Sequence, residues 1–420
     1  MNRNWKIICC LMAWLVPGGC GEPSAGTDDT DSADTDSTAT DSDMTLGFRL
    51  LGEDTIDQIE ALNSTLFAQM PDLPALNAPL RSNVTVYRLN YPTEANGEPV
   101  VASALVAMPT ALAGPLPVIS FQNGTITRDA DAPTRSWPAV NTRVLTGIAA
   151  FGYAVVIPDY IGFGASADIV HPYLCADATV DAVVDALDYV LADSRAVDAG
   201  YSLSGDLFLL GYSQGGHATL AVARDLEEND SNYTLRAVAA GAGPYDLTAV
   251  NNYIIEQDTY AEPFYAPYTL IAFRAMGFIT QPLSTFLQEP YASLVEDLFD
   301  GQRSPADINA ALPTRISELY APELTSGFDS SEVFAPLREA FVDNSIGPWT
   351  AEAPIRLYHG TADVNLPASI STRMQSDLEN AGAVSVSFIA IDGRDHSEAG
   401  PYMILDALAW FNELNGFNGE

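Results

Sequence analysis

The sequence is poor in cysteine and histidine, and this limits the kinds of site it can hold. Four cysteines occur among 420 residues, and three of them lie within the first 20 positions. Cys175 is alone in the rest of the chain, so no intramolecular disulfide is expected there. We expect Cys175 to be a small buried hydrophobe rather than a nucleophile. With four histidines and no Cys or His cluster at ligand spacing, no structural metal site is expected.

Basic residues are also scarce. The chain has 18 Lys and Arg against 55 Asp and Glu, a formal net charge of -37. A field of this sign repels nucleic acid and anionic membrane surfaces, so neither is expected as a partner of the folded part. Hydrophobic residues nevertheless make up 47% of the chain, which is ample for the core of a globular protein.

Long hydrophobic runs are missing, so the sequence predicts no transmembrane helix, which needs about 18 or more uncharged residues. The apolar run at residues 7–16 follows two basic residues and is typical of an export signal spanning residues 1–20. The end of this segment resembles a bacterial lipoprotein signal, in which the Cys after small residues is lipidated. Pro17 departs from the Leu usual in that signal. We expect a lipid anchor at Cys20, with plain cleavage nearby as the alternative.

Residues 21–43 contain no large apolar side chain and are rich in Asp, Thr and Ser. Such a segment cannot bury enough surface to offset the entropy of ordering, so it predicts a disordered, self-repelling linker. The folded part of the chain would then be held at the bacterial cell envelope, on the outer membrane or cell surface, or would otherwise be secreted or periplasmic.

Beyond residue 80, short β-branched or apolar runs alternate with helical patterns. This alternation predicts an α/β fold with a mostly parallel sheet flanked by helices. The predicted strands are 84–89, 100–108, 117–121, 153–158, 207–212, 236–240, 355–358 and 384–391. The predicted helices of the core are 179–192, 214–226, 369–381 and 400–414.

The alternation stops between residues 247 and 353, a segment with many aromatic residues and no strand pattern. A structureless loop of that length is implausible, so the segment predicts a helical cap, or lid, inserted between two core strands. The core would then consist of residues 44–246 and 354–420. Most of the aromatics should form the core of the cap, and the sequence leaves open whether a few of them contact substrate.

The segment Gly211-Tyr212-Ser213-Gln214-Gly215 fits the G-x-S-x-G pattern of a nucleophile elbow. The pattern alone is weak evidence, but an apolar run precedes it and a helical pattern follows it. That is the strand, tight turn and helix that hold a nucleophilic serine in a strained conformation. Ser213 is therefore the predicted nucleophile, and a glycine-rich turn with a capping serine is the alternative.

A serine hydroxyl needs an adjacent base, and the base needs an acid to orient it. In this fold the three follow the chain in the order Ser, Asp or Glu, His. Chain order selects His396, which we expect in a polar loop after the strand at 384–391. The predicted acid is Asp363, which follows the strand at 355–358, with Asp246 as its competitor. His359 is expected to be a structural hydrogen-bonding residue.

Acyl transfer also needs donors for the tetrahedral oxyanion, each contributing about 3 to 4 kcal/mol in comparable sites. One should be the backbone N–H of Gln214, the residue after the nucleophile. The other should come from the loop after the strand at 117–121, as the amide of Gly124 or Thr125, with the Asn123 side chain as a helper.

Five segments together resemble the α/β-hydrolase superfamily and, more narrowly, its secretory lipase branch with bacterial relatives. They are FQNGT at 121–125, PDYIGFGAS at 158–166, GYSQGGH at 211–217, HGTAD at 359–363 and the loop of His396. The resemblance covers about residues 80–415. It implies the α/β-hydrolase fold, hydrolysis of carboxylic esters, a helical lid and no cofactor. The catalytic residues of the family carry over onto Ser213, Asp363 and His396, whereas the oxyanion loop varies among relatives.

The sequence thus predicts a serine lipase or esterase that acts through an acyl-enzyme on hydrophobic acyl or aryl esters, because an aromatic-rich cap should line an apolar pocket. Its partner would be a small ester or lipid substrate, with membrane contact only through Cys20. A serine peptidase of the same fold would share the triad, but the cap shows no carboxylate pair or Arg cluster for a charged peptide terminus. A surface binding protein without activity is the other alternative, and the intact Ser, Asp and His argue against it.

Overall fold

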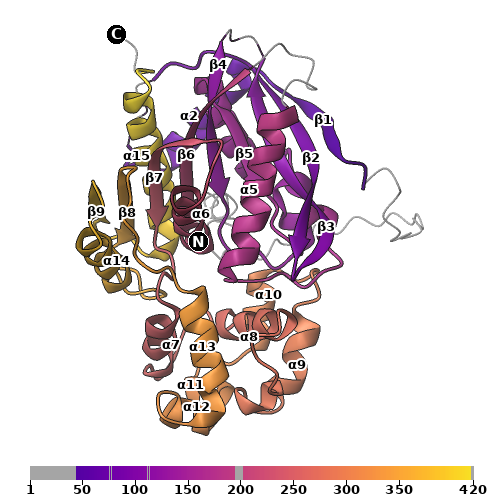
Figure 1. Cartoon of the computed structure of the whole chain (residues 1–420), viewed down its shortest axis with the longest axis vertical. Helices are drawn as coiled ribbons and strands as arrows, with labels where there is room; N and C mark the ends of the chain where they lie inside the picture. Colours follow the sequence, from indigo (N-terminus) through magenta and orange to yellow (C-terminus); the bar gives the residue numbers. More distant parts are fainter. Residues whose placement is uncertain are drawn as a thin grey trace.

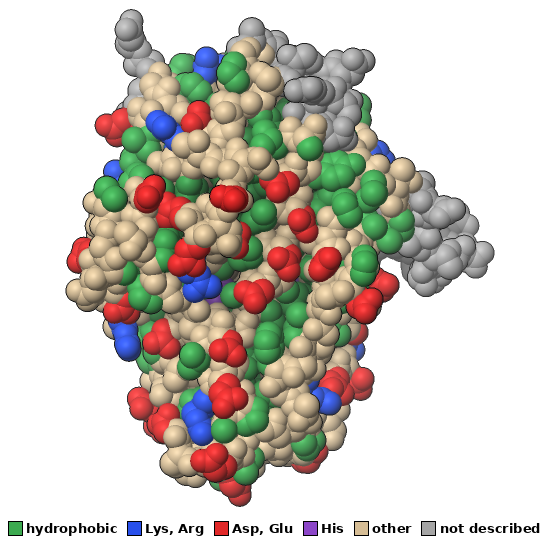
Figure 2. Space-filling view, viewed as in Figure 1, with side chains coloured by type: hydrophobic (Ala, Val, Ile, Leu, Met, Phe, Trp, Pro, Cys, Tyr) green, Lys and Arg blue, Asp and Glu red, His purple; other side chains and the backbone are tan. Residues whose placement is uncertain are grey.

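The computed structural model describes residues 44–74, 76, 78–110, 112, 114–193 and 202–417. The predicted export signal at 1–20, the anchor at Cys20 and the linker at 21–43 lie outside these residues and stay predictions. Across the described part of the chain, no helix combines the length and the apolar character needed to cross a bilayer. Figure 2 shows carboxylate side chains spread over the visible face of the molecule, with few basic ones among them.

Nine strands of the described residues form one sheet in the order β1-β2-β3-β5-β4-β6-β7-β8-β9 (Figure 1). The strands are β1 (Gly47–Asp54), β2 (Val84–Ala95), β3 (Glu98–Pro109), β4 (Pro115–Gln122), β5 (Ala154–Pro158), β6 (Ser202–Tyr212), β7 (Thr234–Gly241), β8 (Ile355–Gly360) and β9 (Val386–Ile391). The pairs β1/β2, β2/β3 and β3/β5 are antiparallel, and the remaining pairs are parallel. The mostly parallel sheet is as predicted.

All eight predicted strands are present, with ends displaced by a few residues. Strand β1 was not predicted. It pairs only with β2 at one edge of the sheet, and its residues are mostly half-buried or exposed. A strand in that position does not need the apolar alternation by which strands are recognised in a sequence.

Both faces of the sheet are covered by helices, which explains the apolar character of the central strands. In β6, Leu207 and Leu209 belong to one hydrophobic cluster and Phe208 and Leu210 to another. Side chains alternate across a strand, so consecutive residues reach opposite faces. The core helices are α2 (Ile56–Gln69), α3 (Pro133–Ser136), α4 (Val140–Thr146), α5 (Ala176–Asp193), α6 (Gln214–Glu228), α14 (Ser369–Asn380) and α15 (His396–Leu414). The first cluster includes residues of α5, α6 and α14, and the second includes residues of α15.

Helix α15 begins at His396, four residues before the predicted start at residue 400. The prediction that His396 lies in a loop was therefore wrong. Asp395 caps the helix, since its side chain accepts a hydrogen bond from the N–H of Glu398 at 2.9 Å. Asp395 followed three residues later by Glu398 resembles the start signal of a helix, whereas the Pro401 near the predicted start lies inside it.

Between β7 and β8 the chain forms helices and loops with two isolated β-bridges, and we call residues 247–353 the helical insertion. Its helices are α7 (Leu247–Ile255), α8 (Tyr265–Ala275), α9 (Tyr291–Leu298), α10 (Pro305–Ala311), α11 (Ile316–Leu319), α12 (Pro322–Gly327) and α13 (Ala335–Asn344). Figure 1 draws them as a group at the lower end of the sheet. Phe264, Phe273, Phe286 and Phe334 are fully buried within one hydrophobic cluster made mainly by the insertion. Most of its aromatics thus serve its own packing.

Candidate active site

Ser213 occupies the turn between β6 and α6 in a conformation that non-glycine residues seldom adopt. Its φ is 60° and its ψ is -123°, and its N–H donates to the carbonyl oxygen of Gly241 at 2.8 Å. A backbone in this region is strained and persists only where its surroundings enforce it. The side chain is buried and lines a pocket. The strand, turn and helix are those that the pattern at 211–215 predicts.

The glycines of the pattern are required because backbone segments meet here without room for a side chain. A Cβ atom on Gly215 would lie 1.9 Å from the carbonyl oxygen of Gln122, and one on Gly211 would lie 2.2 Å from the carbonyl oxygen of Gly215. Gly216, which the pattern does not include, would place its Cβ 2.4 Å from the carbonyl oxygen of Gly241. The turn is therefore packed between the ends of β4 and β7.

Gly215→Ala should lower the free energy of unfolding by about 2 kcal/mol or more, because the atom in the way is backbone and cannot rotate aside. Urea unfolding of the variant measures this. Gly327→Ala is the matched control, since its Cβ would find its nearest neighbour at 3.6 Å, and its unfolding free energy should change by less than about 1 kcal/mol. Equal stabilities of the two variants would contradict the packing argument.

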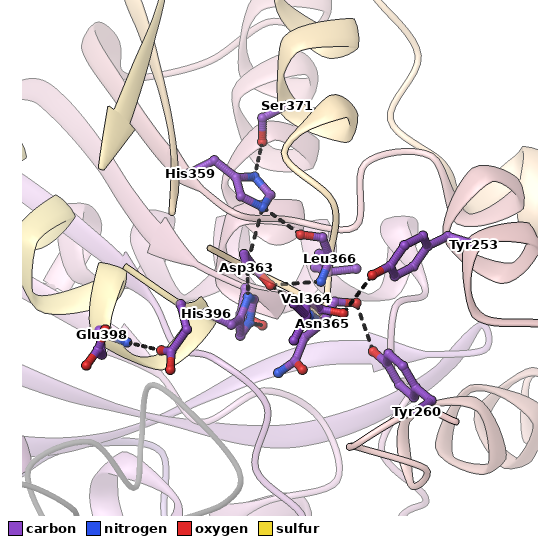
Figure 3. Close-up of polar contacts among 12 residues, drawn as sticks. Tyr253, Tyr260, His359, Asp363, Val364, Asn365, Leu366, Ser371, His396 and Glu398 are labelled. Carbon is purple, nitrogen blue, oxygen red and sulfur yellow. Dashed lines mark hydrogen bonds and ion pairs between the residues drawn. The ribbon is translucent and has the colours of Figure 1, made fainter. Parts of the chain in front are cut away.

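The structure brings Ser213, His396 and Asp363 together in one hydrogen-bonded chain (Figure 3). The Nε2 atom of His396 lies 2.9 Å from the Ser213 Oγ, and its Nδ1 lies 2.6 Å from the Asp363 Oδ2. Because a carboxylate can only accept, Nδ1 carries the proton and Nε2 presents its lone pair to the serine. All three side chains are buried. Water therefore competes little with these contacts.

Asp246, the alternative candidate for the acid, makes contacts outside the triad. Its carboxylate caps α7 by accepting a hydrogen bond from the N–H of Ala249 at 2.9 Å, and it lies 3.7 Å from the Nη1 of Arg373. Neither of these contacts involves His396. The geometry therefore favours Asp363 over Asp246 as the acid.

The Asp363 carboxylate is held from several sides. Its Oδ1 accepts the N–H groups of Asn365 and Leu366, each at 2.9 Å, and the Nε2 of His359 lies 3.2 Å from its Oδ2. Burial raises the pKa of this carboxyl, but electrostatic attraction by His396 and hydrogen bonds from His359 and His396 outweigh burial and leave the pKa well below its usual range. Asp363 is thus ionised at neutral pH.

The fully buried His359 was assigned a structural hydrogen-bonding role by the sequence, and its contacts include the acid itself. Its Nε2 also lies 2.9 Å from the carbonyl oxygen of Leu366, and its Nδ1 lies 2.8 Å from the Ser371 Oγ. Both neighbours of Nε2 are acceptors, so Nε2 carries a proton and donates to them.

The two remaining histidines support the site without reaching the Ser213 hydroxyl. His171 donates from Nδ1 to the carbonyl oxygen of Ile161 at 2.6 Å and accepts from the Gln214 Nε2 at 2.8 Å. The Nε2 of His217 contacts the carbonyl oxygen of Asn344 at 2.8 Å. Burial lowers the pKa of each to about 4, so both are neutral near pH 7.

The predicted oxyanion donors lie around the elbow. Gln214 is the first residue of α6, and within the described part of the chain its N–H has no hydrogen-bond acceptor. Gly124 and Thr125 follow β4 in the buried loop whose backbone packs on Gly215. Thr125 shares a hydrogen bond of 3.1 Å with the Tyr173 hydroxyl. The Asn123 amide atoms are buried and have no partner among the described residues. The role of these donors stays a prediction.

Ser213 and His396 form part of the wall of a largely apolar pocket between the core and the helical insertion. About 760 Å³ of it is free of protein atoms, including a part that is open to solvent. The lining from the insertion is mainly aliphatic and aromatic, and it includes Leu247, Val250, Ile254, Tyr260, Tyr265, Leu270, Tyr320, Leu324, Leu337 and Phe341. The site can therefore take an apolar group next to the serine.

Cys175, the one cysteine among the described residues, is buried and does not line this pocket. Burial raises the pKa of the Cys175 thiol, which keeps it protonated and a poor nucleophile. Among the residues the structure describes, no three His, Cys, Asp or Glu side chains are arranged to hold a metal ion.

The family model described as "Secretory lipase" matches residues 137–420. A candidate hydrolase from Legionella pneumophila is similar in structure, with 23% identity, a TM-score of 0.79, and coverage of 89% of this chain and 99% of that one. A ligand-bound form of the rice cell wall degrading esterase LipA from Xanthomonas oryzae is 25% identical, with a TM-score of 0.74 over 88% and 97% of the chains. Candida antarctica lipase A is 18% identical, with a TM-score of 0.62 over 89% and 82%. No curated protein matches the sequence. These structural similarities confirm the predicted α/β-hydrolase fold.

Proposed function

Because the chain belongs to the secretory lipase family, we propose that it is an exported serine hydrolase that cleaves carboxylic esters through an acyl-enzyme. The observation that carries the proposal is the unbroken hydrogen-bonded chain from Asp363 through His396 to Ser213 at the wall of an apolar pocket. The names of the esterase and lipase among its structural neighbours support the same class of reaction.

In the first half of the reaction, the Nε2 of His396 takes the Ser213 proton as Oγ attacks the ester carbonyl. The N–H of Gln214 and an amide of Gly124 or Thr125 stabilise the resulting oxyanion. Collapse of this intermediate breaks the bond to the alcohol oxygen, which receives the proton from His396. Asp363 remains ionised and keeps the proton of the imidazole on Nδ1 in the resting state.

In the second half, the same imidazole removes a proton from water, which attacks the acyl-enzyme carbonyl. The proton then returns to Ser213 and the carboxylic acid leaves. The reaction has no redox step, and its one co-reactant is water.

The substrate class follows from the pocket. Its lining is mainly apolar, and most of it comes from the helical insertion, so we assign the insertion the role of a lid over a hydrophobic acyl or aryl ester. With the insertion as the lid, the α/β-hydrolase core comprises residues 44–246 and 354–420. The proposal includes a lipid anchor at Cys20, which the linker at 21–43 joins to the enzyme. Cys20 would then be the one point of contact with the membrane, and no nucleic-acid partner is expected.

Two measurements on the mature exported protein test the proposal. A fluorophosphonate probe should label one site per chain, and p-nitrophenyl esters of increasing acyl length should be hydrolysed, because the serine is activated and its pocket is apolar. Labelling without ester hydrolysis but with peptide cleavage would favour the peptidase. Folded protein that neither reacts nor hydrolyses would favour the binding protein.

A further inference from the structure

Two tyrosines of the helical insertion extend to the loop that carries Asp363. Tyr253 lies in α7, and its hydroxyl donates to the carbonyl oxygen of Val364 at 2.8 Å. Tyr260 lies between α7 and α8, and its hydroxyl donates to the carbonyl oxygen of Asn365 at 3.0 Å. Figure 3 shows both rings directed at this loop, opposite His359.

The two carbonyl groups belong to the peptide groups that hold the acid. The carbonyl of Val364 and the N–H of Asn365 form one peptide group, and the carbonyl of Asn365 and the N–H of Leu366 form the next. Both N–H groups donate to the Asp363 Oδ1 at 2.9 Å. Each tyrosine hydroxyl is therefore connected to the carboxylate through a single peptide group.

Hydrogen bonds in such a chain strengthen one another. A peptide carbonyl that accepts a hydrogen bond is more polarised, which makes the N–H of the same peptide group a better donor. Here the acceptor is an ionised carboxylate, for which hydrogen bonds are stronger than between neutral groups. The Tyr260 hydroxyl bond is buried, whereas the Tyr253 bond is accessible to solvent, so Tyr260 should contribute more.

We propose that Tyr253 and Tyr260 are positioning residues for Asp363, through which the helical insertion supports the triad as well as enclosing the substrate. This inference rests on the proposed function. It assigns the lid a second task, because any displacement of α7 or of the segment around Tyr260 would remove the hydrogen bonds that polarise the two peptide groups of the acid loop.

Other charged or titratable groups also face the acid and its partner. His396 and His359 contact the carboxylate, and the ring hydroxyls of Tyr212 and Tyr265 lie near enough to sense its charge. Glu262 of the insertion interacts with His396, and its burial raises the pKa of that carboxyl to about 7. Substitutions at Tyr253 and Tyr260 leave all of these groups in place.

Tyr253→Phe, Tyr260→Phe and the double variant test the inference, with kcat expressed per site that the fluorophosphonate labels. Tyr260→Phe should lose about 3- to 10-fold in kcat, Tyr253→Phe about 2-fold, and the double variant more than either. KM should not change in Tyr253→Phe, since Tyr253 does not line the pocket. The acid limb of the kcat profile should move to higher pH, because an Asp363 carboxylate with weaker hydrogen bonds attracts the proton that lies between it and the imidazole more strongly.

Tyr91→Phe is the matched control. The Tyr91 hydroxyl is also buried and donates to a backbone carbonyl, that of Ala182 at 2.7 Å, but it lies between β2 and α5, away from the triad. Its loss should lower stability without changing kcat or the acid limb. If both tyrosine variants behave like Tyr91→Phe while Ser213→Ala is inactive, the inference is overturned and the proposed function stands. Activity retained by Ser213→Ala would overturn both.

Discussion

Replacing Ser213 by alanine should lower kcat/KM for a p-nitrophenyl ester by about three to six orders of magnitude. The serine oxygen is the atom that the free lone pair of His396 faces, at 2.9 Å, and alanine leaves the base with no hydroxyl to activate. The fluorophosphonate probe should no longer label the protein. The residual rate would come from the oxyanion donors and the pocket, which remain intact.

Two further variants make this result specific. Ser376→Ala removes an exposed hydroxyl on α14 that donates to the carbonyl oxygen of Thr372, within its own helix, so it should retain wild-type activity. A Ser213→Ala, His396→Ala double variant should be about as slow as Ser213→Ala alone, because the two residues act as one unit. More than about a tenth of wild-type activity in Ser213→Ala would rule out Ser213 as the nucleophile.

The core strands could be predicted because buried parallel strands appear as short apolar runs between helical patterns. The segment before residue 80 contained weaker patterns. In α2 only Ile59 and Leu66 are buried, so no broad apolar stripe marks the helix. A start signal was nevertheless available, because Thr55 and Gln58 form a capping box.

The triad could be proposed from the sequence because chain order and strand ends restrict the choice of base and acid. The residues that support the triad could not be predicted, because they depend on contacts between segments that are distant in the sequence. Tyr253 and Tyr260 are separated by more than a hundred residues from the carbonyl groups they bond, and no periodicity relates them. Similarly, the need for Gly216 arises from the approach of β7, which is visible only in the folded chain.

The second large effect on activity is expected from replacing the acid, Asp363. Asp363→Asn should lower kcat by about 10⁴-fold, the size of loss known for a serine protease triad whose acid becomes an amide. The N–H groups of Asn365 and Leu366 will hold the amide oxygen at the place of Oδ1, which leaves the NH₂ group facing Nδ1 of His396. The imidazole must then accept a hydrogen bond at Nδ1 and carry its own proton on Nε2. In this tautomer Nε2 has no free lone pair to take the proton of Ser213.

Asp246→Asn is the matched control for this substitution, because asparagine caps a helix about as well as aspartate and α7 should be undisturbed. Its kcat should lie within about 2-fold of the wild type. Steady-state hydrolysis of the same ester by the two variants, with folding verified by circular dichroism, decides between the candidates. A large loss in Asp246→Asn and a small one in Asp363→Asn would reverse the assignment, and the tautomer of His396 would then depend on a carboxylate that does not contact it in this structure.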